Sequence, residues 1–461
     1  MAVAVTIYLT RVLEKQNYGI MVSAVGALGW ANLIADFGLT ILGQREVARS
    51  RVPQHAMVRT VIGMQLIFSV VAFLALAGFV LLMPAKTPFL TREVILLYGL
   101  TLPISAFDLR WVFYGMEKMW VVSVAEIIMQ AILTIGALLF VTKPEHLVAL
   151  PIIYLVGQAI PVLYVLVQYV RMYGFPTPSL ERTMLRHLTT DALPLCGSAA
   201  IGMVLNNFAT LIIPTIMTMD NMGEYGAAQR IVWVPTLFIA AYYLTLRPSL
   251  SRAYVDGIES INNLLRKSVR LTIALAMGMM TGGLMLGEPF IHFAFKEEFE
   301  GAIVPFEILV LATGILFVNR LFRGILISFN HQVAEFKMMF AAALANVVFA
   351  FALIGRFGIA GVAVATLLGE AVMLAMGYVY TRFLVGRIAF GRFLLRPFIG
   401  SIIMAVVLYA TPQLHVVTRI AIGGVVYLAA LAALRVIHWD DVMMIANALM
   451  PSRRAPQESA T

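Results

Sequence analysis

Long apolar runs follow one another along almost the whole chain, and short polar loops separate them. About 20 helical residues cross a hydrocarbon core of about 30 Å, so runs of this length predict transmembrane helices. A shorter apolar segment at residues 1–9 resembles the last third of a further span. The pattern predicts an all-α polytopic membrane protein of about 14 transmembrane helices, the first of them truncated. The complete spans are expected at residues 18–42, 59–83, 94–113, 120–142, 147–170, 192–217, 227–246, 271–295, 303–328, 338–355, 358–380, 398–412 and 416–436.

The composition excludes soluble proteins and a built-in ATP motor. Hydrophobic residues make up 61% of the chain and charged residues 12%, which fits no soluble globular class. A net charge of +9 would suggest a nucleic-acid partner in a soluble protein. Here the basic residues gather in alternate loops, as the positive-inside rule requires, so no nucleic-acid partner is expected. The chain also lacks the glycine-rich phosphate loop of ATP-driven motors.

Basic loops recur after every second span and predict the orientation. Cytoplasmic loops of membrane proteins carry an excess of arginine and lysine, so these loops and the tail at residues 437–461 are expected on the cytoplasmic side. The residues concerned are Arg45, Arg49, Arg51 and Arg59; Arg171, Arg182 and Arg186; Arg252, Arg266, Lys267 and Arg270; and Arg382, Arg387, Arg392 and Arg396.

A weak internal repeat indicates two halves. The residues Gln16-Asn17-Tyr18-Gly19 precede one span, and Gly223-Glu224-Tyr225-Gly226 precede another. Many transporters consist of such duplicated halves. The expected organisation is a six-helix N-terminal lobe (1–170), a cytoplasmic linker (171–190), a six-helix C-terminal lobe (191–383), two additional helices (384–436) and a cytoplasmic tail (437–461).

Several charged residues lie inside the predicted spans. A charged side chain at the centre of a membrane helix costs about 2.5–3.5 kcal/mol on insertion scales, so such residues normally face a bundle interior or a watery cavity. Glu370 lies near the middle of its span, whereas Asp36 lies near a span end, where a helix cap is the simpler interpretation. Glu370, Asp36, Asp108 and Arg110 are our candidates for gating or for ion coupling.

Asn319, Arg320 and Arg323 form the most informative cluster. Because Arg320 and Arg323 are three residues apart, both project from nearly the same helix face. Two like charges there repel unless an anion or carboxylates lie opposite, and arginine binds phosphate and carboxylate with two parallel hydrogen bonds. We expect these three residues, with Arg230, to bind a pyrophosphate or an acidic sugar. The alternative is a structural ion pair with Glu307 or Glu370.

Four short stretches resemble a known family. They are residues 9–19 (LTRVLEKQNYG), 36–49 (DFGLTILGQREVAR), 113–119 (FYGMEKM) and 295–299 (FKEEF). Their order and spacing resemble the polysaccharide flippases of the O-antigen (Wzx-type) branch of the multidrug/oligosaccharidyl-lipid/polysaccharide exporter superfamily. The likeness covers essentially the whole chain. The chain departs from the family at its start, so either upstream in-frame codons encode the rest of the first helix or that helix is short.

The resemblance implies two six-helix lobes that open alternately around a central cavity, followed by two further helices. It implies a flippase that moves a polyprenyl-pyrophosphate-linked oligosaccharide, an O-antigen or exopolysaccharide repeat unit, across the bacterial inner membrane. Such transport involves no covalent chemistry, so we expect no enzyme activity and no cofactor. Membrane lipids and a polysaccharide polymerase are the other expected partners, and coupling to a proton or sodium gradient is a hypothesis from the positions of the carboxylates.

Two other transport functions stay open. A cation-coupled multidrug exporter of the same superfamily would need an anionic cavity, whereas the deepest predicted cluster is cationic. A lipid II flippase would carry a strongly basic first helix, which this chain lacks in the part present. A polysaccharide polymerase or a lipid-linked glycosyltransferase would need a long external loop, and no loop between the predicted spans is long enough.

Overall fold

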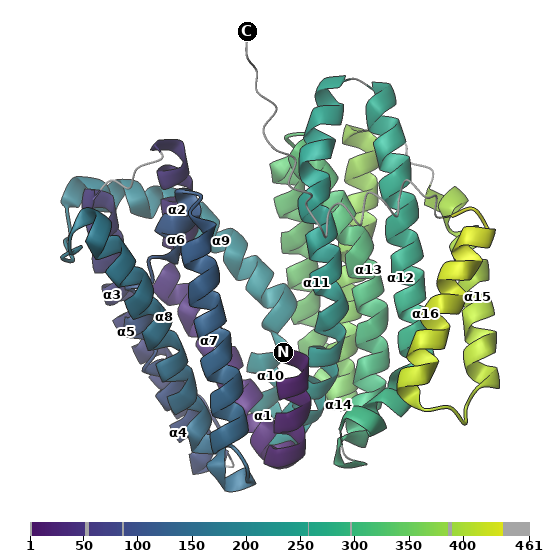
Figure 1. The fold of residues 1–461 in the computed structure, drawn as a ribbon, viewed down its shortest axis with the longest axis horizontal. Coiled ribbons are helices and arrows are strands. Elements are labelled where there is room, and N and C mark those ends of the chain that lie inside the picture. Colours follow the sequence, from purple (N-terminus) through teal and green to yellow (C-terminus); the bar gives the residue numbers. More distant parts are fainter. Residues whose placement is uncertain are drawn as a thin grey trace. The chain divides into compact units, whose positions relative to one another are not determined.

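The computed structural model describes residues 2–50, 55–84, 87–256, 258–295, 297–385 and 390–436, and most of these residues are helical (Figure 1). Within these ranges, nine helices are long and apolar enough to cross a membrane, and no strand occurs. The predicted all-α, multi-pass membrane fold is thus confirmed. The elements in chain order are α1 (Ala2–Asp36), α2 (Leu39–Ser50), α3 (His55–Leu82), α4 (Phe89–Gly99), α5 (Leu102–Ser105), α6 (Arg110–Gly115), α7 (Met119–Phe140), η1 (Pro144–Val148), α8 (Ala149–Tyr173), α9 (Arg182–Asn207), α10 (Ala209–Ile216), α11 (Met219–Asp256), α12 (Ile258–Ala294), η2 (Glu297–Ala302), α13 (Ile303–Ser328), α14 (Gln332–Leu384), η3 (Phe390–Phe393), α15 (Leu395–Ala410) and α16 (Val416–Ala433).

The chain forms two compact units. Unit 1 contains the described residues up to Ala227, together with Phe295–Ala302 and Phe357–Ile359. Unit 2 contains Ala228–Ala294, Ile303–Arg356 and the described residues from Ala360 onwards. Helices α9 and α10 contact α1, so they pack within unit 1. The lobe boundaries proposed from the sequence stay a prediction.

Two long elements each contain two helices. In α1 the backbone leaves the helical region at Glu14 (φ 64°, ψ 172°), which separates the short N-terminal segment from the next span. In α14 the break lies at Gly358 (φ 59°, ψ −139°), between the predicted spans 338–355 and 358–380. Glycine suits that position because its backbone adopts positive φ at little cost.

The two copies of the repeat motif contact each other in unit 1. A Cβ atom on Gly19 would lie 1.8 Å from the carbonyl oxygen of Met219, and one on Gly223 would lie 2.3 Å from that of Lys15. Only glycine allows the start of α11 to lie this close to α1. Beside this contact, Lys15 Nζ lies 2.9 Å from Glu224 Oε1.

The prediction of one unbroken span at residues 18–42 is wrong. Helix α1 ends at Asp36, Phe37 and Gly38 have positive φ values of 49° and 80°, and α2 begins at Leu39. The Asp36 carboxylate accepts hydrogen bonds from the backbone N–H groups of Gly38 (3.2 Å) and Thr40 (3.1 Å). An aspartate that satisfies these free donors begins a new helix in preference to continuing the old one.

The single span predicted at residues 94–113 is also wrong, because the chain forms α4, α5 and α6 there. Pro103 lies in the first turn of α5, where its missing N–H group is tolerated. Before α6, the Asp108 carboxylate accepts a hydrogen bond from the backbone N–H of Arg110 at 3.1 Å. At both helix breaks near the candidate carboxylates, the carboxylate therefore accepts a backbone N–H group at the start of the next helix.

In unit 2, helix α12 contacts α13, α15 and α16, and α15 contacts α16 (Figure 1, yellow). Two buried tyrosines, Tyr243 on α11 and Tyr427 on α16, each form a hydrogen bond with α12. The Tyr243 hydroxyl lies 2.7 Å from Thr272 Oγ1, and the Tyr427 hydroxyl donates a hydrogen bond to the Ala274 carbonyl at 2.6 Å. Because both contacts join α12 to another helix, they fix the helices that surround the cavity described below.

Candidate functional site

Unit 1 contains a cavity of about 350 Å³ whose lining is rich in polar side chains; we call it the polar cavity. The residues come from the end of α1, from α2 and α3, from the interrupted region α5–α6, and from α7. The helix breaks at Asp36 and Asp108 bring these groups together. The lining consists of Asn32, Ala35, Asp36, Thr40, Gln44, Gln65, Ser105, Asp108, Arg110, Trp111, Tyr114 and Glu126.

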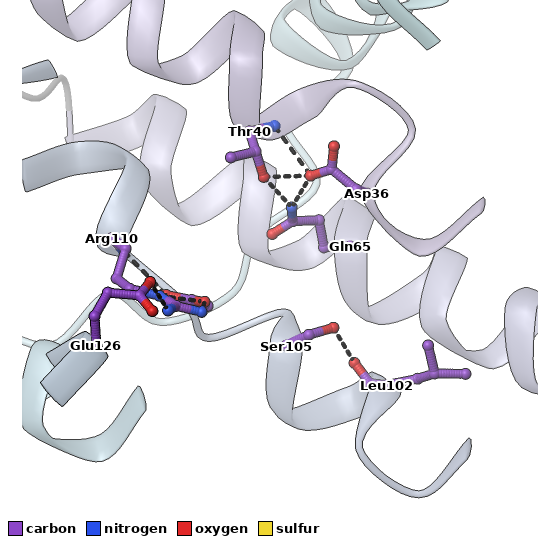
Figure 2. A network of polar contacts seen from close by, with 8 residues as sticks. Asp36, Thr40, Gln65, Leu102, Ser105, Arg110 and Glu126 are labelled. Carbon is purple, nitrogen blue, oxygen red and sulfur yellow. Dashed lines mark hydrogen bonds and ion pairs between the residues drawn. The ribbon is translucent and has the colours of Figure 1, made fainter. Parts of the chain in front are cut away.

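Arg110 contacts two carboxylates on the lining of the polar cavity, and Figure 2 shows the contact with Glu126. Its Nε lies 2.9 and 2.8 Å from the two oxygens of Asp108, and its Nη1 lies 2.5 Å from Glu126 Oε1. The Arg110 and Asp108 side chains are only 18% and 17% exposed, whereas Glu126 is 54% exposed. The structure thus pairs the two predicted residues with each other. Glu126 completes the ion-pair network.

Asp36 forms a second hydrogen-bonded group in the same cavity. Gln65 Nε2 donates to Asp36 Oδ1 at 3.1 Å and to Thr40 Oγ1 at 3.4 Å, and the Thr40 hydroxyl also contacts Asp36 (Figure 2). Sequence reasoning missed Gln65. Its signal is a buried amide within the apolar span of α3, where a polar group needs a partner.

Two residues of the cavity lining each carry a buried polar atom without a partner among the described residues. Gln65 and Trp111 are 5% and 2% exposed. Within the described ranges, neither Gln65 Oε1 nor Trp111 Nε1 has a hydrogen-bond partner. Figure 2 shows the Gln65 carboxamide oxygen turned away from Asp36. The described residues contain no cluster of three or more histidine, cysteine or acidic side chains suited to a metal ion.

In unit 2 the structure brings Asn319 and Glu370 together. Asn319 Nδ2 donates to Glu370 Oε2 at 2.7 Å and to the Glu370 backbone carbonyl at 2.9 Å. The residues are 1% and 6% exposed, so the carboxylate lies inside the helix bundle. A buried carboxylate needs such a donor because desolvation strongly disfavours an isolated charge.

One arginine of the predicted cluster is paired with a carboxylate. Arg323 Nε donates to Glu335 Oε1 at 2.7 Å, and Arg320 lies on the same helix, α13. Sequence reasoning considered Glu307 and Glu370 as partners and missed Glu335. The short turn between α13 and α14 indicates the pairing of Arg323 with Glu335, because residues at similar distances before and after a hairpin turn lie side by side.

Arg230 lies on an exposed face of α11, in unit 2. Its guanidinium carbon is 5.8 Å from the centre of the Trp233 ring, a distance typical of a cation–π contact. The Arg230 guanidinium thus lies over the Trp233 ring. A role for Arg230 in anion binding stays a prediction.

Unit 2 also contains a cavity of about 770 Å³ lined almost entirely by apolar groups; we call it the apolar cavity. Sequence reasoning missed it. The signal is glycine on neighbouring helices, such as Gly282 on α12 and Gly424 on α16, because small residues leave space between packed helices. A Cβ atom on Gly424 would meet nothing within 4 Å. The lining consists of Ile231, Val232, Pro235, Leu271, Ala274, Leu275, Gly278, Met279, Gly282, Gly283, Leu286, Phe290, Phe306, Val310, Met404, Leu408, Ile420, Gly423, Gly424, Tyr427, Leu428 and Leu431.

Comparison with protein families gives one match. A family model described as "Polysaccharide biosynthesis protein" matches residues 1–254, more than half of the chain. No curated protein matches the chain.

Two solved structures have a similar fold. The lipid II flippase MurJ, in an inward closed conformation, aligns with a TM-score of 0.79 at 13% identity over 96% of each chain. An inward-facing multidrug resistance MATE family transporter of the MOP superfamily aligns with a TM-score of 0.63 at 14% identity, over 83% of this chain and 97% of that chain. At these identities the likenesses show the fold.

Proposed function

Because the chain belongs to the polysaccharide biosynthesis protein family and has the fold of the exporter superfamily, we propose that it is a flippase for a polyprenyl-pyrophosphate-linked oligosaccharide. It carries an O-antigen or exopolysaccharide repeat unit across the bacterial inner membrane by alternating access. MurJ, whose fold the chain shares, is a lipid II flippase, which supports a lipid-linked substrate.

The observation that carries this proposal is the presence of two unlike cavities in one chain of this family. A lipid-linked oligosaccharide has a hydrated head and a long hydrocarbon tail. The polar cavity of about 350 Å³ offers hydrogen-bonding groups, and the apolar cavity of about 770 Å³ offers almost none. Burial of each CH₂ group stabilises an apolar ligand by about 0.8 kcal/mol, so the apolar cavity suits a polyprenyl chain.

The cluster around Arg323 is the proposed pyrophosphate contact. The Arg323 guanidinium already holds the Glu335 carboxylate at 2.7 Å. A pyrophosphate presents the same oxygen geometry with more charge, so it exchanges with the carboxylate on the guanidinium. Arg320 and Asn319 lie on the same helix, α13, and Asn319 holds the Glu370 carboxylate at 2.7 Å.

We further propose that transport involves no covalent step, so the protein is a transporter and not an enzyme. Proton coupling through Glu370, Asp36 or Asp108 belongs to the same proposal, and a sodium gradient is the alternative driving force. Two functions in the same superfamily are alternatives. A multidrug exporter is favoured by the acidic excess in the polar cavity, and a lipid II flippase by the fold that the chain shares with MurJ.

Deletion of the gene in its native host tests the proposal. We expect a surface polysaccharide to disappear and its lipid-linked repeat unit to accumulate in the cytoplasmic leaflet, while drug susceptibility and cell-wall synthesis stay normal. The wild-type gene supplied in trans restores the polysaccharide. Raised drug susceptibility with normal polysaccharide would favour the multidrug exporter, and lysis with lipid II accumulation would favour the lipid II flippase.

The proposed orientation has its own test. Single cysteines replace Ser50, at the end of α2, and Gln413, between α15 and α16, on a Cys196→Ala background. Both positions are exposed, so both thiols are chemically accessible. In intact spheroplasts an impermeant maleimide should label Gln413→Cys and leave Ser50→Cys unlabelled until the membrane is opened. The reverse pattern would invert the topology.

A further inference from the structure

We propose that the polar cavity of unit 1 binds an uncharged sugar ring of the transported molecule and excludes acidic sugars. The inference rests on the proposed function, because it assigns the sugar end of that substrate to a site. It assigns to unit 1 the selection of the sugar, separately from the anion contact at Arg323.

Two residues of the lining, Gln65 and Trp111, each have a buried polar atom that lacks a hydrogen-bond partner among the described residues. Gln65 Oε1 is a buried acceptor and Trp111 Nε1 a buried donor, and neither has a partner in the part of the chain that the structure describes. Each unmet buried group carries a desolvation penalty that a hydrogen-bonding ligand removes. A sugar hydroxyl both donates and accepts a hydrogen bond, so a glycan supplies partners for an acceptor and for a donor alike.

The charged groups on the lining of the polar cavity are mostly acidic. The lining carries three carboxylates, Asp36, Asp108 and Glu126, and one guanidinium, Arg110. That guanidinium is already used by Asp108 and Glu126. Carboxylates accept hydrogen bonds from hydroxyl groups and repel a second carboxylate, so the cavity favours an uncharged ring over a uronic acid or a phosphate.

The volume and the lining of the polar cavity fit a small polar ligand. A volume of about 350 Å³ lies at the small end of the range of about 300–1,000 Å³ for small-molecule sites. Tyr114, which is 37% exposed, adds an aromatic wall for the C–H face of a ring. The cavity therefore suits a short stretch of the glycan, whereas a polyprenyl chain would leave its polar lining without partners.

A coupling cation explains the same site less well. A cation would be held by the carboxylates and by Gln65 Oε1. It leaves the Trp111 N–H group unsatisfied, because an indole nitrogen is a donor only and repels a positive charge. A hydroxyl-bearing ligand supplies partners for an acceptor and for a donor alike.

Saturation-transfer NMR on the purified full-length protein in nanodiscs tests the inference. The probes are methyl glucoside, methyl N-acetylglucosaminide and glucuronic acid, each at millimolar concentration. We expect transfer to at least one of the two uncharged glycosides and at least tenfold less to glucuronic acid. Gln65→Leu and Trp111→Phe should each weaken the glycoside signal about five- to tenfold, because each removes one of the two unpartnered polar atoms.

Gln130→Leu is the matched control, since Gln130 lies on α7 outside the cavity and donates a hydrogen bond to Thr134 Oγ1 at 3.2 Å. It should bind like the wild type. Equal or stronger transfer to glucuronic acid overturns the inference, as does wild-type binding by both cavity variants. Stabilisation by Na⁺ without any glycoside signal overturns it in favour of a cation site. Normal polysaccharide export in the deletion strain would instead refute the proposed function, and the binding result would still stand.

Discussion

In unit 1 the helices around the cavity break at Asp36 and Asp108, whereas in unit 2 helices α12 and α16 run unbroken past glycines. The breaks bring carboxylates, amides and an arginine together in unit 1. The glycines make room in unit 2 without adding a polar atom. Capping aspartates thus build a site for hydrated groups, and small residues build one for hydrocarbon.

The two regions also differ in how completely their polar groups are satisfied. The polar cavity keeps two buried atoms without partners among the described residues, on Gln65 and Trp111. In the apolar cavity the one tyrosine hydroxyl on the lining, that of Tyr427, donates to the Ala274 carbonyl. A site with unmet polar atoms suits a polar ligand, and one without them suits an apolar ligand.

The largest expected effect is in the ion-pair network of unit 1. Arg110→Leu leaves the Asp108 carboxylate, 17% exposed, without its partner. Breaking a buried ion pair costs about 3–5 kcal/mol, so thermal unfolding in detergent should show a strongly destabilised variant. The double variant that combines Arg110→Leu with Asp108→Asn should regain most of the thermal stability. Glu126→Gln, at an exposed position, should change little; if it destabilised the protein as much as Arg110→Leu, the network would be centred on Glu126.

In unit 2, Arg323→Ala and Arg320→Ala should each reduce export of the lipid-linked sugar by roughly ten- to hundredfold. A lost charge-assisted hydrogen bond is worth about 1.5–3 kcal/mol. Protein amount in the membrane should stay normal, and Arg→Lys should rescue only in part because the forked geometry is lost.

Glu335→Gln separates substrate binding from a structural ion pair at Arg323. If the arginine binds substrate, Glu335→Gln keeps export and does not repair Arg323→Ala. If the pair is only structural, Arg323→Ala lowers the amount of protein, and combining it with Glu335→Gln restores it. Wild-type export by both alanine variants would remove the cluster from the substrate path.

Filling the apolar cavity should reduce export about tenfold. Gly424→Phe places a ring in open space, since no atom lies within 4 Å of a Cβ there, so folding should be preserved. Gly424→Ala is the control and should export normally. Surface polysaccharide and membrane protein amount are measured together. Normal export by a well-expressed Gly424→Phe variant would exclude this cavity from lipid binding.

The smallest effect is expected at the cap of α2. Thr40→Val removes the hydroxyl that contacts Asp36 and Gln65 and keeps the side-chain shape. One such hydrogen bond is worth about 0.5–1.5 kcal/mol, so thermal stability should fall slightly. Thr215→Val, which removes a hydroxyl bonded to backbone carbonyls on α10, is a control outside the cavity. A larger loss at Thr215 would contradict a special role for the cap.

Hydrophobic runs were sufficient to predict the all-α membrane fold, because helices that cross a bilayer must satisfy their own backbone. They did not predict the breaks at Asp36 and Asp108, where side-chain caps compete with helix continuation. Glu335 was missed because its pairing depends on a hairpin turn between two spans. The apolar cavity was missed because it depends on which helices become neighbours, and apolar periodicity does not contain that information.

We propose that the two ends of the substrate bind different cavities, and photo-crosslinking tests this most directly. Purified protein is irradiated with a polyprenyl-pyrophosphate-linked monosaccharide that carries a diazirine either on the terminal isoprene or on the sugar. Mass spectrometry should locate tail adducts on α12, α15 or α16 and sugar adducts on α1, α3 or α6. Tail adducts at Gln65 or Tyr114, or sugar adducts at Gly424, would contradict the assignment.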